Sequence, residues 1–140
     1  MRVVLDTNVV VAGLRSKSGA SRLWLECLLR RQHIWLMSVP LMLEYEEVLL
    51  RQENRTQSGL TVAEVNDLLD AFCGVTEHVD LSPIWRPVLR DPDDEMVLAT
   101  GFLGRADMLL TFNVRDFAQA QGHGIEIVTP GNAWAKTTGG

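Results

Sequence analysis

The fold of this chain is decided by residues 1–13, MRVVLDTNVVVAG. The stretch begins as an apolar, β-branched run, which is typical of a strand buried on both faces of a sheet. The run then meets a carboxylate, Asp6, and continues with more apolar residues. An ionised carboxylate at the edge of a core costs roughly several kcal/mol unless a charge or a hydrogen bond meets it. Asp6 therefore either caps the next segment, because Asp-Thr-Asn favours a turn, or helps to hold a metal ion at the carboxyl end of a central parallel strand.

The composition is that of a single globular domain, with 140 residues of which 46% are hydrophobic and 22% charged. No apolar run reaches the roughly 18 residues of a membrane span, and the N-terminus lacks a signal-peptide pattern, so we expect a cytoplasmic protein with no membrane partner. A formal charge of −5 argues against a simple electrostatic nucleic-acid binder. It still permits a nucleic-acid enzyme whose carboxylates hold a cation that binds phosphate. Cys27 and Cys73 lie among apolar residues, which favours two buried thiols over a disulfide.

Strands and helices are predicted to alternate along the chain. After the first strand, predicted strands cover residues 33–38, 75–81, 106–111 and 125–128. Predicted helices cover residues 20–31, a segment from Pro40, residues 61–73 with a capping box, a segment from Pro92, and 130–134. Predicted connections are 14–19, 52–59 and 82–90, and a disordered tail, 136–140, follows a single domain over 1–135. Alternation predicts a mainly parallel sheet with right-handed crossovers, so the carboxyl ends of the strands lie at one edge.

Glu44 is predicted to lie at this edge. On a helical wheel it borders one side of the buried face of its helix and Glu46 borders the other, whereas Glu47 points away. Glu44 lies nearer to the end of the preceding strand. We therefore select Glu44 as a candidate and assign Glu46 and Glu47 to solvent.

Asp94 is predicted to lie at the same edge, in the first turn of the helix from Pro92. Capping and the helix dipole account for its neighbours Asp91, Asp93 and Glu95 without any function. They account less well for Asp94, which shares a helix face with apolar residues and should point towards the core. An acid in that position is a candidate functional residue.

Asp116 lies just past the strand that ends at Thr111, as Asp6 lies just past the first strand. The structural alternative is a short helix capped by Asn113 with Asp116 in its first turn. Asp6, Glu44, Asp94 and Asp116 thus meet at one edge, where without a cation they would raise one another's pKa values. One or two Mg²⁺ or Mn²⁺ ions would account for the cluster, because hard cations bind oxygen ligands. The chain has no zinc-type His/Cys set, no Gly-rich phosphate loop and no Gly-x-Ser-x-Gly motif.

Four motifs occur in order along the chain: VVLDTN at 3–8, SVPLMLE at 38–44, RDPDD at 90–94 and LTFNVRDF at 110–117. With these motifs the chain resembles a PIN domain over nearly its whole length. More narrowly, it resembles the stand-alone VapC-like toxins of bacterial and archaeal toxin–antitoxin systems. The resemblance implies an α/β/α sandwich with a five-stranded sheet of order 3-2-1-4-5 and metal-dependent endoribonuclease activity. It also implies an RNA substrate and a small antitoxin protein as partner, with a homodimer or higher oligomer left open.

The resemblance also implies roles for individual residues. The acids that it makes metal ligands and catalytic residues are Asp6, Glu44, Asp94 and Asp116. The residues that would hydrogen-bond around them are Thr111, Asn113 and Asn8. Asn113 stands where many members of the family have another Asp, so the number of metal ions that the site binds, one or two, is left open. The basic residues proposed to meet RNA are Arg15, Lys17, Arg90 and Arg115, with ordinary surface charge as the alternative.

The implied chemistry is hydrolysis of a phosphodiester bond, in which the metal would lower the pKa of a water and neutralise phosphate charge. Two other functions are weighed against it. One is a catalytically silent PIN module that binds RNA or a protein partner. The other is a Mg²⁺-dependent phosphotransfer or receiver-like domain, which would need a lysine near its end. No lysine lies between Lys17 and Lys136, and this counts against the receiver alternative.

Overall fold

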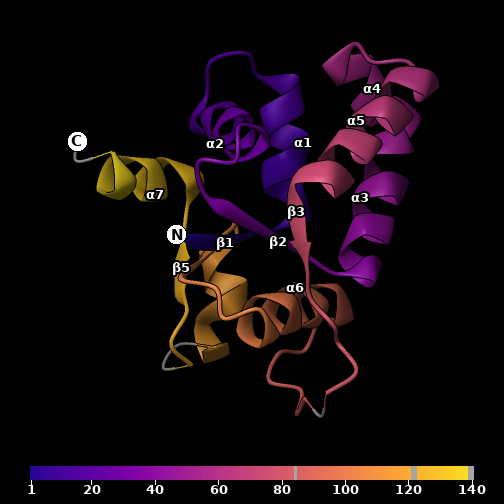
Figure 1. Ribbon diagram of the computed structural model, residues 1–140. Helices are drawn as coiled ribbons and strands as arrows, with labels where there is room; N and C mark the ends of the chain where they lie inside the picture. The colour runs from indigo at the N-terminus through magenta and orange to yellow at the C-terminus, as the bar shows by residue number, and fades with distance from the viewer. Residues whose placement is uncertain (84, 121–122, 139–140) are drawn as a thin grey trace.

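A computed structural model of the chain describes residues 1–83, 85–120 and 123–138. Five parallel strands form its central sheet in the order β3-β2-β1-β4-β5 (Figure 1). The strands are β1 (Arg2–Leu5), β2 (Ile34–Met37), β3 (Thr76–His78), β4 (Met108–Leu110) and β5 (Glu126–Val128). β1 is central, because Val3 pairs with Trp35 of β2 on one side and with Met108 of β4 on the other. The predicted parallel sheet and its strand order are confirmed.

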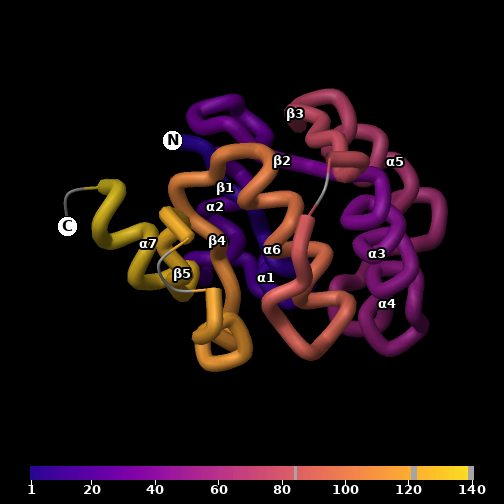
Figure 2. The backbone as a smooth tube through the Cα atoms, turned by 90° about the horizontal axis from the view of Figure 1, so that it is seen from below, coloured from indigo at the N-terminus to yellow at the C-terminus, as the bar shows by residue number. Residues whose placement is uncertain are grey.

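Helices cover both faces of the sheet and make three layers. They are α1 (Thr7–Arg15), α2 (Ala20–Leu29), α3 (Val39–Leu50), α4 (Gln52–Ser58), α5 (Val62–Val75), α6 (Pro92–Leu103) and α7 (Pro130–Thr137), with a 3₁₀ helix, η1 (Val114–Ala120). Helix α6 packs against β1, β2 and β4 on one face, and Figure 1 shows α1 and α2 on the other. Figure 2 shows α7 at one side of the molecule and α3, α4 and α5 at the opposite side. The predicted α/β/α sandwich is confirmed.

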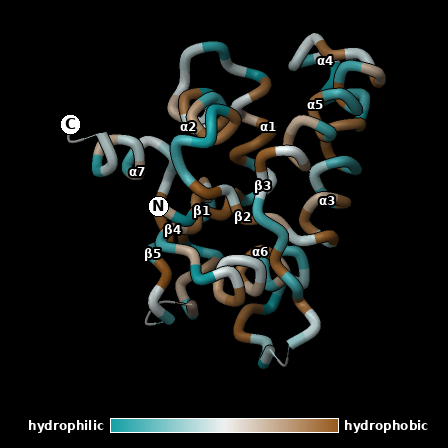
Figure 3. Tube along the Cα trace, viewed as in Figure 1, coloured by the Kyte–Doolittle hydropathy of each residue, from teal (hydrophilic) through white to brown (hydrophobic). Residues whose placement is uncertain are grey.

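The apolar run that opens the sequence forms the centre of the core. Residues 3–5 of β1 are fully buried, as are Val9 and Val10 of α1. Figure 3 shows hydrophobic residues along β1 and α1 in the middle of the fold. The Tyr45 hydroxyl of α3 donates a hydrogen bond to the Leu5 carbonyl, which fixes α3 against the carboxyl end of β1. Because α1 begins directly after β1, α1 and α3 pack together at the edge where the acids were predicted.

The helix starts follow the capping signals in the sequence. Thr61 caps α5 in the predicted capping box, because its hydroxyl accepts from the Glu64 N–H at 3.1 Å and the Glu64 carboxylate accepts from the Thr61 N–H at 3.1 Å. The Ser38 hydroxyl accepts from the Leu41 N–H at 3.3 Å and caps α3. Each cap fixes the direction in which a helix leaves the preceding chain.

Residues 52–58 form helix α4, so the prediction of a loop over 52–59 is wrong. The segment has no apolar periodicity, and none of its residues is fully buried. Its side chains instead hold the end of α3: Asn54 Nδ2 donates to the Val48 carbonyl at 2.7 Å and Arg55 Nε donates to the Leu50 carbonyl at 3.2 Å. Gly59 ends the helix at a φ of 75°, which glycine adopts without strain.

Several other boundaries differ from the predicted ones, most by one or two residues. Helix α1 continues through Arg15, so the connection predicted from residue 14 begins only at Ser16. Helix α7 continues to Thr137, so the tail predicted over 136–140 is helical in its first residues, and its last two residues lie outside the described ranges. The predicted strand 75–81 is reduced to β3 at 76–78.

Cys27 is buried as predicted, whereas Cys73 is exposed, so the prediction of two buried thiols is wrong for Cys73. Cys73 lies beside the buried Phe72 on α5 but on the outward side of that helix. In the described part of the chain, none of the helices has the length and apolar character that a membrane span requires.

Candidate active site

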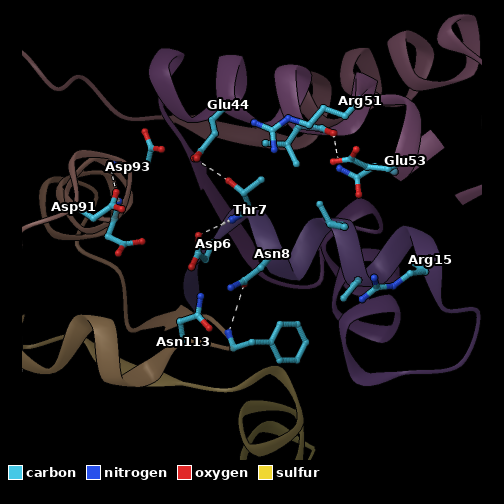
Figure 4. Close-up of a pocket in the computed structure, with 16 residues that line it drawn as sticks. Asp6, Thr7, Asn8, Arg15, Glu44, Arg51, Glu53, Asp91, Asp93 and Asn113 are labelled. Atoms are coloured by element: carbon cyan, nitrogen blue, oxygen red, sulfur yellow. Dashed lines mark hydrogen bonds between the residues drawn. The ribbon is translucent and has the colours of Figure 1, made fainter. Parts of the chain in front are cut away.

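An open cleft of about 600 Å³ lies at the carboxyl ends of β1 and β4, between α1, α3 and α6 (Figure 4). The acids that line it are Asp6, Glu44, Glu53, Asp91, Asp93 and Asp94. The cleft is therefore strongly acidic and lies at the sheet edge where the sequence predicted a cluster. Three of the four predicted acids line it, and the fourth, Asp116, lies beside it.

Asp6 occupies the junction between β1 and α1, with only 8% of its surface exposed. Its Oδ1 accepts from the Thr7 N–H at 2.8 Å, and its Oδ2 accepts from the Thr111 hydroxyl at 2.7 Å. Asp6 is therefore the cap of α1 and a cleft residue at once, so the two alternatives from the sequence are compatible. Each carboxylate oxygen keeps a lone pair for a further partner.

The pKa of Asp6 is raised above its ordinary value, chiefly because burial disfavours the charged form. The hydrogen bonds from Thr111 and Thr7 oppose this rise, and the negative charges of Asp116 and Asp91 add to it. Two hydrogen bonds thus fix the orientation of the Asp6 carboxylate, while the charged groups that shift its pKa are negative.

Glu44 projects from α3 into the cleft towards α1. Its Oε2 accepts from the Thr7 hydroxyl at 2.8 Å, and the side chain is half-buried. Burial raises its pKa, and the charges of Asp93, Asp6 and Asp91 raise it further. Glu46 and Glu47 are exposed. The predicted phase of this helix is therefore confirmed, because Glu44 alone of the three lines the cleft.

Asp94 is half-buried in the first turn of α6. Its pKa is raised from 3.8 to about 6, first by burial and then by the charges of Asp91, Asp6, Asp116 and Asp93. The predicted orientation towards the core side is confirmed. Within the described ranges, no ion pair neutralises Asp94 or any of the other predicted acids.

Asp116 lies in the first turn of η1 and is exposed. It is not among the described cleft-lining residues, but its charge raises the pKa of both Asp6 and Asp94. The short helix that the sequence offered as a structural alternative is present, since the Asp116 N–H donates to the Asn113 carbonyl at 2.9 Å. Asp116 thus lies in that turn and also contributes negative charge to the cleft.

The predicted supporting residues connect these acids to the backbone. The Thr111 hydroxyl is fully buried; it donates to Asp6 and accepts from the Asn113 N–H at 3.0 Å. Asn113 and Asn8 both line the cleft. The Asn8 side-chain oxygen accepts from the Phe112 N–H at 3.4 Å, which draws the start of α1 towards the segment after β4.

Asp91 and Asp93 are cleft residues that the sequence analysis assigned to capping alone. Asp91 does cap α6, because its Oδ1 accepts from the N–H groups of Asp93 at 2.8 Å and Asp94 at 3.3 Å. Because capping fully explains acids at the start of a helix, there was no reason in the sequence to expect Asp91 and Asp93 in the cleft as well. Glu95, also assigned to the first turn, points elsewhere and accepts hydrogen bonds from Val88 N–H at 2.9 Å and Leu89 N–H at 2.6 Å.

One of the four predicted basic residues, Arg15, lines the cleft. Lys17, Arg90 and Arg115 are exposed and lie outside its described lining. Arg51 lines the cleft and was missed. Arg51 directly follows the last residue of α3, so its position depends on where that helix ends, and helical spacing alone does not identify it.

The donors suit a hard divalent cation in kind, because they are carboxylate, amide and hydroxyl oxygens. Across residues 1–83, 85–120 and 123–138, no three His, Cys, Asp or Glu side chains lie close enough together to hold a metal ion as they stand. Burial is the main cause of the raised pKa values of Asp6, Glu44 and Asp94, and neighbouring acids raise them further. The kind of donor therefore fits a cation, whereas the described side-chain positions do not form a closed ligand set.

The fold and the site define a parallel α/β/α domain with carboxylates gathered at the strand ends. Residues 2–115 match the family described as PIN domain, and the chain belongs to this family. The matched region contains Asp6, Glu44 and Asp94 and ends one residue before Asp116.

Two solved structures have a similar fold. One is VapBC2 from Rickettsia felis bound to a DNA fragment from their promoter, with 16% identity, a TM-score of 0.61 and coverage of 91% of this chain and 97% of that one. The other is FitAcB from Neisseria gonorrhoeae, with 19% identity, a TM-score of 0.51 and the same coverage of 91% and 97%. No curated protein matches the sequence.

Proposed function

We propose that the chain is a metal-dependent endoribonuclease that hydrolyses RNA phosphodiester bonds. The observation that carries the proposal is the meeting of Asp6, Glu44 and Asp94, from three separate elements, in one cleft with raised pKa values. Carboxylates that raise one another's pKa values are costly to keep together, and a divalent cation, Mg²⁺ or Mn²⁺, would offset that cost. Membership of the PIN domain family favours this function over the receiver-like alternative.

The residues that would hold the cation are Asp6, Glu44, Asp94 and Asp116. A bound ion would supply water of lowered pKa and would neutralise the charge of the phosphate. Thr111 and the Thr7 N–H fix the carboxylate of Asp6, and the Thr7 hydroxyl fixes that of Glu44. Asn113 presents an amide at the cleft wall, where it can donate hydrogen bonds to phosphate oxygens.

We further propose that the chain is the toxin of a toxin–antitoxin pair and binds a small antitoxin protein. The similarity in fold to the chains of VapBC2 and FitAcB supports this assignment, and in both comparisons the alignment covers 97% of the other chain. We also propose that the chain can form a homodimer or a higher oligomer. Co-expression with any small gene found next to this one, followed by co-purification and measurement of the mass of the complex, tests the partner and the oligomeric state.

The test of the catalytic proposal is cleavage of single-stranded RNA by the purified chain with Mn²⁺ or Mg²⁺ and with EDTA. Cleavage should require the cation. Glu44→Gln should abolish it and leave the fold intact, whereas Glu47→Gln, on the exposed side of the same helix, should change little. RNA binding without cleavage under either cation would favour the catalytically silent PIN module instead. Equal loss of activity in both variants would show that activity does not depend on which face of α3 the acid occupies.

A further inference from the structure

A buried pair of hydroxyl groups joins α3 to α6. Ser38 is the cap of α3 and directly follows β2, and Thr100 lies in the interior of α6. The two hydroxyl oxygens are 2.7 Å apart, and only 1% of the surface of Ser38 and none of that of Thr100 is exposed. In the described part of the chain, no other side-chain hydrogen bond joins α3 or its cap to α6. The other residues that the two helices bury against each other and the sheet are mainly apolar.

Each hydroxyl of the pair donates one hydrogen bond and accepts one. Thr100 donates to the Met96 carbonyl of its own helix at 2.9 Å, so its oxygen can accept from the Ser38 hydroxyl. Ser38 in turn accepts from the Leu41 N–H at 3.3 Å. A continuous chain of hydrogen bonds therefore runs from the first turn of α3, through the two hydroxyls, to the backbone of α6.

The pair gives the contact between the helices a direction. Apolar packing is non-directional, so helices that meet only through apolar side chains are held less strictly in one arrangement. A hydrogen bond restricts the distance and the angle between its donor and its acceptor. Replacement of both partners by apolar groups of the same shape can be nearly neutral for stability. The arrangement of the two helices therefore explains a fully buried hydroxyl pair better than the stability of the core does.

The two helices that the pair joins carry two of the cleft acids. Glu44 follows Ser38 by less than two turns of α3, and Asp94 precedes Thr100 by less than two turns of α6. Burial raises the pKa of Glu44, and the charge of Asp93, in the first turn of α6, raises it further. Figure 4 shows Glu44 beside Asp93 at the cleft. A shift of α6 against α3 would therefore change the distance between the acids of the two helices.

We propose that Ser38 and Thr100 are positioning residues, which hold Glu44 and Asp94 at the separation that a divalent cation requires. This proposal rests on the cation-dependent function above. Both hydroxyls are buried in the core, so neither contacts the cation or the RNA. Thr7 orients the Glu44 carboxylate directly, whereas the hydroxyl pair acts through the helices that carry the acids. Loss of the pair lets α6 shift against α3 and lowers the affinity for the cation.

Two substitutions of Thr100 separate this role from a general loss of stability. Thr100→Val keeps the buried volume and removes the hydroxyl, whereas Thr100→Ser keeps the hydroxyl and removes a buried methyl group. Binding of Mn²⁺ is measured by titration calorimetry, without RNA and at a temperature at which each protein is folded. Thr100→Val should raise the Kd for Mn²⁺ about tenfold, as loss of a residue that orients metal ligands does. Thr100→Ser should bind Mn²⁺ like the parent although the lost methyl group lowers its melting temperature.

Thr137→Val is the matched control for removal of a threonine hydroxyl. Thr137 also donates to a carbonyl of its own helix, that of Ala133, at 2.8 Å. Its helix, α7, lies on the opposite side of the molecule from α3 (Figure 2), so the Kd for Mn²⁺ should not change. If Thr100→Val binds Mn²⁺ like the parent, the pair has no positioning role. Equal losses of affinity in Thr100→Val and Thr100→Ser would also overturn the proposal, because affinity would then follow stability.

Ser38→Ala tests the other half of the pair. It removes the same link and should raise the Kd for Mn²⁺ about as much as Thr100→Val does. The double variant should bind Mn²⁺ scarcely more weakly than either single variant, because the two hydroxyls act as a unit. Its melting temperature should still be lower than that of Thr100→Val, since Ser38 also caps α3. Fully additive losses of Mn²⁺ affinity would show that the two hydroxyls act independently and would overturn the proposal.

Steady-state cleavage separates this proposal from the function on which it rests. Thr100→Val should need about ten times more Mn²⁺ than the parent for half-maximal cleavage, with an unchanged KM for RNA, because the pair does not contact RNA. Cleavage at the Mn²⁺ concentration that the parent needs would overturn the pair and leave the ribonuclease intact. Mn²⁺ binding that Thr100→Val weakens, without cleavage of RNA by any of the proteins, would overturn the ribonuclease and leave the positioning role. A parent chain that binds no Mn²⁺ would overturn both.

Discussion

Thr7 donates its hydroxyl to Glu44 across the cleft at 2.8 Å and so joins the first turn of α1 to α3. The N–H of the same residue donates to Asp6 at 2.8 Å. One buried threonine therefore orients two of the candidate metal ligands. Because these carboxylates come from segments far apart in the sequence, their relative position depends on this residue as well as on the packing of the two helices.

Thr7→Val is expected to reduce activity about tenfold, since removal of a residue that orients a metal ligand commonly has an effect of this size. The unfolding free energy should fall by about 1 kcal/mol, because one hydrogen bond is lost while the buried volume is kept. Thr7→Ser retains the hydroxyl and should keep most of the activity. Cleavage rates and urea unfolding of the two variants provide the measurement. Full activity in Thr7→Val would show that Glu44 needs no fixed orientation.

Metal-free protein should lose stability as pH rises from about 4 to about 6. The pKa of Asp94 is raised from 3.8 to about 6 in the folded chain. The folded state thus binds more protons than the unfolded state in this range, and the stability present at low pH is lost as pH passes through the folded pKa. The free energy of unfolding of the parent protein, measured in EDTA from about pH 4 to about pH 6, should fall as the pH rises. Asp94→Asn should show a smaller decline, and a parallel profile in the two proteins would contradict the assignment of this shift to Asp94.

Addition of Mn²⁺ should raise the melting temperature relative to EDTA. A cation that binds only the folded state stabilises it by about 2.7 kcal/mol at a concentration of one hundred times its Kd. Part of this gain is relief of repulsion among the acids, so the increase should be smaller in Asp6→Asn. Thermal melting of both proteins with EDTA and with excess Mn²⁺ is the measurement. Coincident melting temperatures in the parent would argue against a carboxylate metal site.

Most of the fold could be predicted from the sequence because its strands are short apolar runs separated by helices with apolar faces. The burial of residues 3–5 and the position of β1 at the centre of the sheet follow from that pattern. Helix α4 could not be predicted in this way, because it buries no apolar face. It is held by side-chain hydrogen bonds such as Asn54 to the Val48 carbonyl, which depend on where α3 ends.

The positions of the main acids could be predicted because helix phase and strand ends are local properties. Glu44 and Asp94 point into the cleft as helical spacing indicated. The basic residues could not be sorted in this way. Arg15 lies in the cleft and Lys17 outside it because α1 ends between them, whereas no helix was predicted there and the connection was predicted to begin at residue 14. Arg51 reaches the cleft from just past α3, one residue before the segment that was predicted to be a loop.

The central claim is that Asp6 and Asp94 act together in cation-dependent cleavage of RNA. The most direct test compares cleavage rates, with Mn²⁺, of Asp6→Asn, Asp94→Asn and the double variant. Each single change should reduce the rate by on the order of 10² or more, as expected for loss of a major transition-state contact. The double variant should be scarcely slower than either single one, because groups that act as a unit are not additive. Retained cleavage in a folded Asp94→Asn protein would contradict the account and would leave Asp94 as an ordinary acid in the first turn of α6.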